Sequence, residues 1–159
     1  MTVSTVGVIG AGQMGNGIAH VMSLAGYEVY MNDVNPAALE ASLGLIEKNM
    51  VRQLNSGRIT EAEQTAALAR IKRTTNLEEL GDCDLIIEAA TEDEKIKQKI
   101  FDSLLPHLSA HTILTSNTSS ISITRLASRT DRPEKFLGFH FMNPVPVMQL
   151  VELIRGIAT

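Results

Sequence analysis

Short runs of β-branched and other apolar residues alternate along the chain with segments in which apolar residues recur at helical spacing. These runs predict six strands, at residues 5–9, 28–32, 71–74, 85–88, 113–115 and 136–139. Helical periodicity fills the intervals between the strands, for example at Ile18, Ala19, Val21 and Met22. Such alternation is typical of a parallel sheet covered by helices on both faces, so the pattern predicts a doubly wound α/β fold.

Helix-capping residues predict a helical hairpin after the second strand. Asn35 followed by Pro36 is typical of an N-cap and a first helical position, and this pair opens a long helix that residues 55–57 end. Thr60 and Glu63 have the spacing of a capping box, which opens another helix. A minimal nucleotide-binding unit has one short crossover at this point, so we expect the hairpin to be an insertion.

Length, charge and cysteine content narrow the class of protein. With 159 residues and a formal charge of −4, the chain suits one domain and has no basic run of the kind that binds nucleic acid. No apolar stretch approaches the roughly 20 residues that span a bilayer, and the first residues do not resemble a signal peptide. The single cysteine, Cys83, cannot form an internal disulfide, so we expect a packing or surface residue in a cytoplasmic protein. We expect no metal site and no membrane partner.

A glycine-rich turn joins the first predicted strand to the first helical segment. Its residues are Gly10, Ala11, Gly12, Gln13, Met14 and Gly15. Gly10 suits the tight turn, Gly12 lets phosphates approach the backbone, and Gly15 allows close packing of helix and strand. Because a strand precedes the turn and a helix follows it, the turn predicts a Rossmann-type dinucleotide site, with an ordinary turn or another phosphate site as the alternative.

An acidic residue at the end of the second predicted strand indicates which dinucleotide binds. Asp33 lies 18 residues after Gly15, close to the roughly 20-residue spacing of ribose-binding acids. Its carboxylate is placed to accept hydrogen bonds from both ribose hydroxyls of adenosine, although a solvated loop acid is the alternative. An NADP site needs a cation near the 2′-phosphate, whereas residues 32–35 offer a carboxylate and no arginine. We therefore predict NAD as the cofactor.

Three polar clusters follow predicted strands at the sheet edge where ligands bind in open α/β folds. They are residues 88–92, 116–120 and 140–144. Taken singly, the hydroxyl run at 116–120 is explained by turn hydrogen bonds and helix capping, and a lone histidine by a structural hydrogen bond. Together the clusters and nearby acids supply a hydroxyl, an imidazole and a carboxylate, which suit the oxidation of an alcohol by NAD.

Three motifs are similar to those of one enzyme family. The glycine turn at 10–15, Ser-Asn-Thr-Ser-Ser at 116–120 and Gly-Phe-His-Phe-Met-Asn-Pro-Val-Pro-Val-Met-Gln-Leu-Val-Glu at 138–152 closely resemble the NAD-binding domain of L-3-hydroxyacyl-CoA dehydrogenases, the bacterial 3-hydroxybutyryl-CoA dehydrogenases most of all. The resemblance covers essentially the whole chain, and the 138–152 stretch is far more specific than the glycine turn.

The resemblance implies a set of site residues. His140 matches the family's catalytic base, Glu152 its acidic partner, and Ser119 the serine that contacts the substrate oxygen and nicotinamide. Asn143 matches a residue of the same pocket that contacts both cofactor and substrate. The acid and lysine that flank the nicotinamide-side ribose match Glu92 and Lys97, and a solvated helix face is the alternative for the lysine.

The implied activity is the NAD-dependent interconversion of (S)-3-hydroxyacyl-CoA and 3-oxoacyl-CoA, such as acetoacetyl-CoA, in fatty-acid or butanoate metabolism. Two alternatives remain: a dehydrogenase of another hydroxyacid or sugar, and an NAD-binding module with little turnover. Family members also have a helical C-terminal domain that covers the acyl group, supplies an asparagine and forms the dimer, and we expect residues 1–159 to lack it. A serine that binds CoA in some relatives corresponds to Asn49, so the CoA contacts stay unassigned.

Overall fold

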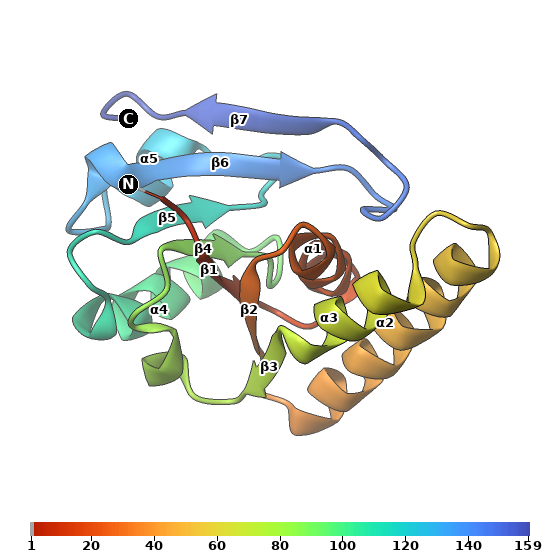
Figure 1. The fold of residues 1–159 in the computed structure, drawn as a ribbon. Helices are drawn as coiled ribbons and strands as arrows, with labels where there is room; N and C mark the ends of the chain where they lie inside the picture. The colour runs from red at the N-terminus through yellow and green to blue at the C-terminus, as the bar shows by residue number, and fades with distance from the viewer. Residues whose placement is uncertain (1) are drawn as a thin grey trace.

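A single seven-stranded sheet forms the centre of the molecule, as the computed structural model of residues 2–159 shows (Figure 1). The strands lie in the order β3-β2-β1-β4-β5-β6-β7, and all neighbouring pairs are parallel except β6 and β7. The strands are β1 Thr5–Ile9, β2 Glu28–Asn32, β3 Ile71–Thr74, β4 Leu85–Glu88, β5 Ile113–Ser116, β6 Phe136–Phe141 and β7 Val151–Arg155. The order of β1 to β6 confirms the predicted doubly wound Rossmann-type fold.

Helices cover both faces of this sheet. They are α1 Gln13–Leu24, α2 Pro36–Asn55, α3 Glu61–Ala69, α4 Glu94–Leu104 and α5 Ile123–Ala127, with short 3₁₀ turns at Leu77–Leu80, Leu105–His107 and Pro133–Lys135. In Figure 1, α1, α2 and α3 lie on one side of the sheet and α4 and α5 on the other. Each face therefore has its own buried apolar cluster.

Alternation along the central strands explains why two clusters form. Val8 of β1 and Ile87 of β4 belong to the cluster under α1, α2 and α3. The next residue along β1, Ile9, and the preceding residue along β4, Ile86, belong to the cluster under α4 and α5. Because successive side chains of a strand point to opposite faces, a strand covered on both sides is apolar throughout. This burial accounts for the continuous apolar runs in the sequence.

The inserted helical hairpin has the predicted caps. Asn35 accepts a hydrogen bond from the Ala37 N–H at the start of α2. Thr60 accepts from the Glu63 N–H while the Glu63 carboxylate accepts from the Thr60 N–H, so both halves of the capping box are present. These bonds satisfy N–H groups that have no partner within a helix.

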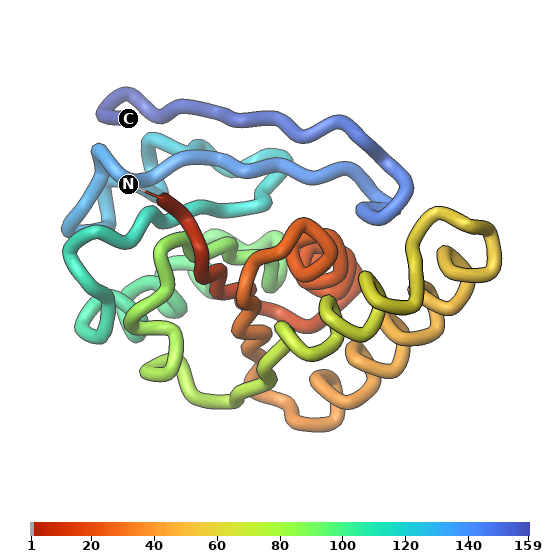
Figure 2. The backbone as a smooth tube through the Cα atoms, in the orientation of Figure 1, coloured from red at the N-terminus to blue at the C-terminus, as the bar shows by residue number. Residues whose placement is uncertain are grey.

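The sheet has one strand more than the sequence predicts. β7 pairs antiparallel with β6, and four of its five residues are exposed, so its side chains carry little of the burial signal by which strands are recognised. β6 also extends to Phe141, two residues beyond the predicted end, and β5 extends to Ser116. His140 therefore lies within β6 and not after it, where the sequence pattern places it. Figure 2 shows β6 and β7 running side by side along one edge.

Two further predictions concern single features. Cys83 is buried in the cluster under α4 and α5, and burial followed by the nearby charges of Asp84 and Asp82 raises its pKa to about 12. It is therefore a packing residue and not a reactive thiol. Within residues 2–159, no helix is both long enough and apolar enough to cross a bilayer.

Candidate functional site

The turn between β1 and α1 leaves room for a phosphate beside the backbone. Gly10 has φ +100°, a conformation that side chains disfavour. A Cβ at Gly15 would lie 1.7 Å from the Gly10 carbonyl oxygen, whereas a Cβ at Gly12 would meet no atom within 4 Å. Gly12 thus faces open space at the N-terminus of α1, which has no side-chain cap and no acidic residue in its first turn. This geometry fits the pyrophosphate of a dinucleotide.

Asp33 is held beside this turn. Its Oδ2 accepts a hydrogen bond from the Ala11 N–H at 2.9 Å, and its Oδ1 accepts from the Asn35 N–H at 2.9 Å. A pocket of about 500 Å³ opens next to the carboxylate, and its lining includes Val34 and, from α4, Ile96. The arrangement combines a fixed hydrogen-bond acceptor with an apolar wall, which suits an adenosine.

His140 and Glu152 form a pair across the antiparallel strands β6 and β7. The two residues lie directly opposite each other in the register, and the distance from His140 Nδ1 to Glu152 Oε2 is 2.8 Å. Because a carboxylate only accepts, the proton of this bond belongs to Nδ1, which leaves Nε2 of a neutral imidazole as an acceptor. The side chain of His140 is 20% exposed and that of Glu152 is 49% exposed.

The residues implied by the family resemblance meet at one pocket of about 320 Å³. Its lining residues are Met14, Ala89, Ala90, Glu92, Lys97, Asn117, Ser119, His140, Phe141, Met142 and Asn143. They come from the glycine turn, from the segments that follow β4 and β5, and from β6 with its following loop. Glu152 is not in the lining but contacts His140 from β7. We call this pocket the imidazole pocket.

Asn143 and Asn117 connect the parts of the imidazole pocket. The Gln13 side-chain amide donates to Asn143 Oδ1 at 3.3 Å, which joins the glycine turn to the loop after β6. Asn117 Oδ1 accepts from the Phe141 N–H at 2.8 Å and so ties the end of β5 to β6. Sequence reasoning gives Asn117 no role of its own, although its place within the 116–120 motif is the signal that could have identified it.

Glu92 is anchored by the 118–120 segment. Its Oε1 accepts from the Ser119 N–H at 2.9 Å, from the Ser120 hydroxyl at 2.9 Å and from the Thr118 hydroxyl. Burial acts to raise the pKa of Glu92, but these hydrogen bonds and the charge of Lys97 outweigh burial and lower the pKa to about 2. Glu92 is therefore an anion at neutral pH, and its Oε2 remains turned toward Lys97.

Lys97 is paired with a residue that sequence reasoning gives no separate role. Its Nζ lies 2.8 Å from Oε1 and 2.9 Å from Oε2 of Glu88, the last residue of β4, and both side chains are almost fully buried. The alternative of a solvated lysine on a helix face is therefore wrong. A glutamate that ends an otherwise apolar strand, shortly before a lysine in the first turn of a helix, is the sequence signal for this pair.

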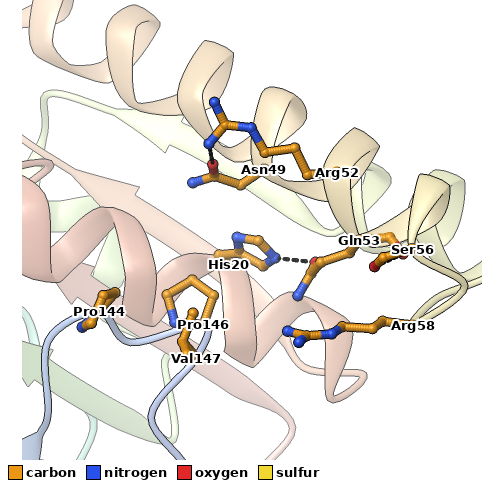
Figure 3. A pocket seen from close by; sticks show the side chains of 9 residues that line it. All are labelled: His20, Asn49, Arg52, Gln53, Ser56, Arg58, Pro144, Pro146 and Val147. Atoms are coloured by element: carbon orange, nitrogen blue, oxygen red, sulfur yellow. Dashed lines mark hydrogen bonds between the residues drawn. The ribbon is translucent and has the colours of Figure 1, made fainter.

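A second pocket lies on the other side of the loop that carries Asn143. It measures about 330 Å³ and is lined by Pro144, Pro146 and Val147 on one side and by α1, α2 and the α2–α3 connection on the other. The residues of that second wall are His20, Asn49, Arg52, Gln53, Ser56 and Arg58 (Figure 3). We call it the arginine pocket.

Polar side chains are fixed inside the arginine pocket. His20 is buried and its Nε2 lies 2.8 Å from Gln53 Oε1. Burial lowers the pKa of His20, and the bond to Gln53 opposes part of that shift. Asn49 lies on the same wall and accepts a hydrogen bond from Arg52 at 3.4 Å. Figure 3 shows the Arg52 side chain on α2, beside Asn49, and the Arg58 side chain extending from the α2–α3 connection below Gln53.

Known proteins resemble this chain in sequence and in fold. A 3-hydroxybutyryl-CoA dehydrogenase of Bradyrhizobium diazoefficiens is 57% identical over 157 residues, which cover 99% of this chain and 54% of that protein. The crystal structure of (S)-3-hydroxybutyryl-CoA dehydrogenase PaaH1 from Ralstonia eutropha matches with a TM-score of 0.96 and 46% identity, over 99% of this chain and 56% of that one.

A fatty acid oxidation complex subunit alpha of Pseudomonas savastanoi is 42% identical and is covered over 21% of its length. The chain thus spans about half the length of the dehydrogenases it resembles and a smaller part of the fatty acid oxidation subunit. Residues 5–159 match the family described as the NAD-binding domain of 3-hydroxyacyl-CoA dehydrogenase. This chain therefore belongs to the 3-hydroxyacyl-CoA dehydrogenase NAD-binding domain family, and its cofactor is NAD.

Proposed function

We propose that this chain is the cofactor-binding and catalytic-base half of a cytoplasmic enzyme that interconverts (S)-3-hydroxyacyl-CoA and 3-oxoacyl-CoA. The observation that carries the proposal is the His140–Glu152 pair, whose imidazole lines the same pocket as Met14 of the glycine turn and Ser119. An oriented base, a hydroxyl donor and the cofactor turn then meet at one place. That combination suits the oxidation of a secondary alcohol.

Cofactor binding is divided between the backbone and side chains. The pyrophosphate would lie against Gly12 and the N-terminus of α1, and Asp33 would accept the hydroxyls of the adenosine ribose. Glu92 and Lys97 would hold the ribose on the nicotinamide side. When bound there, NAD supplies the acceptor of the substrate hydride.

Proton transfer falls to the chain's own residues. His140 Nε2 would accept the hydroxyl proton of the substrate, and Glu152 would stabilise the imidazolium that results. Ser119 and Asn143 would hold the substrate oxygen, with Asn143 fixed in turn by Gln13. A rigid pair across two hydrogen-bonded strands keeps the imidazole aimed without reorganisation during the reaction.

The arginine pocket supports CoA as the carrier of the acyl group. CoA bears phosphates, and Arg52 and Arg58 provide cations in a pocket separated from the imidazole pocket by a single loop. We propose that the nucleotide end of CoA lies against these arginines while the acyl end reaches His140. This placement would give the nucleotide end of CoA protein contacts, which the sequence analysis leaves unassigned.

The test is a steady-state assay of the 159-residue chain with NADH and acetoacetyl-CoA, followed by the loss of NADH. We expect turnover that requires His140 and is about two orders of magnitude below that of a full-length relative, because surfaces that position the acyl group contribute several kcal/mol. The His140→Gln variant is the negative control, and a full-length relative is the reference.

Other results would replace the proposal. Turnover with a free hydroxyacid or sugar but none with acetoacetyl-CoA would assign another dehydrogenase activity. Tight NAD binding with no turnover on either substrate would leave an NAD-binding module. Turnover equal to that of a full-length relative would overturn the need for further acyl-binding surface.

A further inference from the structure

The carboxylate of Glu88 is fully engaged by donors. Its Oε1 accepts from Lys97 Nζ at 2.8 Å and from the Ser116 hydroxyl at 2.7 Å. Its Oε2 accepts from Lys97 Nζ at 2.9 Å and from the Ala90 N–H at 2.9 Å. Glu88 has no exposed surface, so it can contact neither cofactor nor substrate. Any effect of Glu88 on the reaction has to pass through Lys97.

Lys97 reaches the imidazole pocket from this buried position. It is 1% exposed as a residue, yet it lines the pocket together with Glu92. The distance from Lys97 Nζ to Glu92 Oε2 is 3.8 Å, longer than a hydrogen bond. Two of the three ammonium hydrogens point to Glu88, so one remains for a ligand hydroxyl near Glu92. Glu88 therefore sets the direction of that remaining donor.

The three side chains also give this wall of the imidazole pocket a net negative charge. Two carboxylates share one ammonium, so the three groups together carry one net negative charge, and Lys97 lies closer to Glu88 than to Glu92. His140, which also lines the pocket, is paired with Glu152. NAD⁺ carries a positive charge on its nicotinamide ring that NADH lacks, so a net negative charge on this wall would favour the oxidised cofactor in the pocket.

Resting on the function proposed above, we propose that Glu88 is a positioning residue that neutralises Lys97 and thereby sets the relative affinity of the site for NAD⁺ and NADH. Without Glu88, Lys97 would compensate Glu92, and the preference for the positively charged ring would weaken. A buried pair that only stabilised the fold would alter the binding of both cofactors equally. The ratio of the two dissociation constants separates these roles.

The experiment measures dissociation constants of NAD⁺ and NADH for the wild-type chain and for Glu88→Gln, without substrate. Removing one elementary charge from this wall should raise the ratio of the NAD⁺ constant to the NADH constant about two- to tenfold. The matched control is the double variant Glu88→Gln with Lys97→Met, which removes both charges and leaves the net charge of the wall as in the wild type. Its ratio should return to within about twofold of the wild-type value.

Two more variants keep the test decisive. Ser116→Ala removes a hydrogen bond to Glu88 without a change of charge, so the ratio should stay at the wild-type value. If circular dichroism shows that Glu88→Gln does not fold, Glu92→Gln replaces it, because Glu92 is 43% exposed and its neutralisation should raise the ratio in the same direction.

An unchanged ratio in folded Glu88→Gln, or in Glu92→Gln where it serves as the replacement, would overturn the inference. So would a double variant whose ratio stays shifted like that of the single variant, or a Ser116→Ala ratio that shifts as in Glu88→Gln. Those results would leave the proposed function intact as long as both cofactors bind. If the wild-type chain bound neither cofactor, the proposed function and this inference would both fail.

Discussion

The two halves of the sheet make their contributions to the site by different means. On the β1–α1–β2 side, the backbone forms most of the site. Gly12 leaves open space at a helix N-terminus, and Asp33 is held by two backbone N–H groups. On the β4–β7 side, side chains from β6 and from the segments that follow β4, β5 and β6 converge on the imidazole pocket, and β7 supplies the partner of His140. The backbone part of the site needs only one local turn to form. The side-chain part forms only when the strands of the sheet are in place.

Burial separates the same two halves. Val6 and Val8 of β1 are fully buried, while Leu153 of β7 is 66% exposed. The glycine turn thus rests on the centre of the core, whereas Glu152, the partner of His140, lies on an exposed edge strand. Cofactor binding and proton transfer should therefore respond separately to mutation.

The largest effect should come from His140→Gln. Removing a general base typically lowers kcat about 10²–10⁴-fold, while the NAD dissociation constant should change less than about threefold because the β1–α1–β2 side is untouched. Steady-state kinetics and cofactor titration measure the two quantities. His111→Gln, a change at an exposed histidine beside Asp84, is the matched control and should alter neither. A kcat for His140→Gln within about threefold of wild type would make this histidine structural.

The first half of the site could be predicted from sequence because its parts are close together in the chain. Gly10, Gly15 and Asp33 have fixed spacings, and their geometry follows from a strand, a turn and a helix. The pairing of His140 with Glu152 follows instead from the family resemblance, because their contact depends on a strand that the pattern of apolar residues does not reveal. β7 is exposed, and exposure removes the alternation by which a strand is recognised.

Contacts between distant segments set a further limit. The family resemblance places Lys97 near the cofactor, with a solvated helix face as the alternative, and only the packing of α4 against the end of β4 shows that its charge is buried against Glu88. The arginine pocket likewise needs the 144–147 loop to lie beside α2, so Arg52 and Arg58 have no signal of their own. Local geometry can be predicted from one sequence, whereas these contacts become certain only once the helices and loops are placed against the sheet.

Gly12→Ala should separate cofactor binding from folding. The added Cβ meets no protein atom within 4 Å, so the free energy of unfolding should stay within about 0.5 kcal/mol of wild type. It would occupy the space of the pyrophosphate, so NAD affinity should fall about tenfold or more. Calorimetric titration and chemical denaturation check the two parts. The control is Gly44→Ala, within α2 and also facing open space, which should stabilise the chain by about 0.5–1 kcal/mol without changing affinity.

Asp33 should make the site reject NADP. A 2′-phosphate beside this carboxylate brings like charges together, which costs about one to a few kcal/mol and lowers affinity about tenfold or more relative to NAD. Titration of both cofactors measures the difference, and Asp33→Asn should narrow it. Asp102→Asn, at an exposed position on α4, keeps the same overall charge change away from the site and should leave the difference intact. Equal affinities of the wild-type chain for NAD and NADP would show that Asp33 does not contact the adenosine ribose.

Acid should weaken the connection between the two halves. Asp84 joins β1 to β4 by accepting from the Ser4 and Thr5 N–H groups and from their hydroxyls. These bonds, the Ser4 N–H first, hold the pKa of Asp84 well below the ordinary 3.8. A lowered pKa adds stability that is present above the unfolded-state pKa and is lost as the pH falls through the folded-state value.

Denaturation series at several pH values below about 4 test this effect. The free energy of unfolding should decrease with acid less steeply in Asp84→Asn than in wild type. Asp131→Asn is a useful comparison, because the pKa of Asp131 is lowered chiefly by Arg132 and not by a contact between the two halves. Identical acid slopes for Asp84→Asn and wild type would show that Asp84 does not contribute through its charge.

Substitutions at the exposed edge of the sheet should have the smallest effect on the free energy of unfolding. We expect them to change self-association instead. Leu150, Leu153 and Ile157 are 58%, 66% and 88% exposed near or on β7, and an apolar edge strand favours pairing with a second copy. We expect sedimentation to show concentration-dependent self-association. Leu153→Lys should reduce this association while changing the free energy of unfolding by less than about 0.5 kcal/mol, because the side chain is mostly in water already.

Leu45→Lys, at a similarly exposed apolar position on α2, should leave the association unchanged. If the wild-type chain stays monomeric at every concentration, the exposed edge at β7 does not drive self-association. The two halves of the sheet would then differ in how they build the site but not in their tendency to associate.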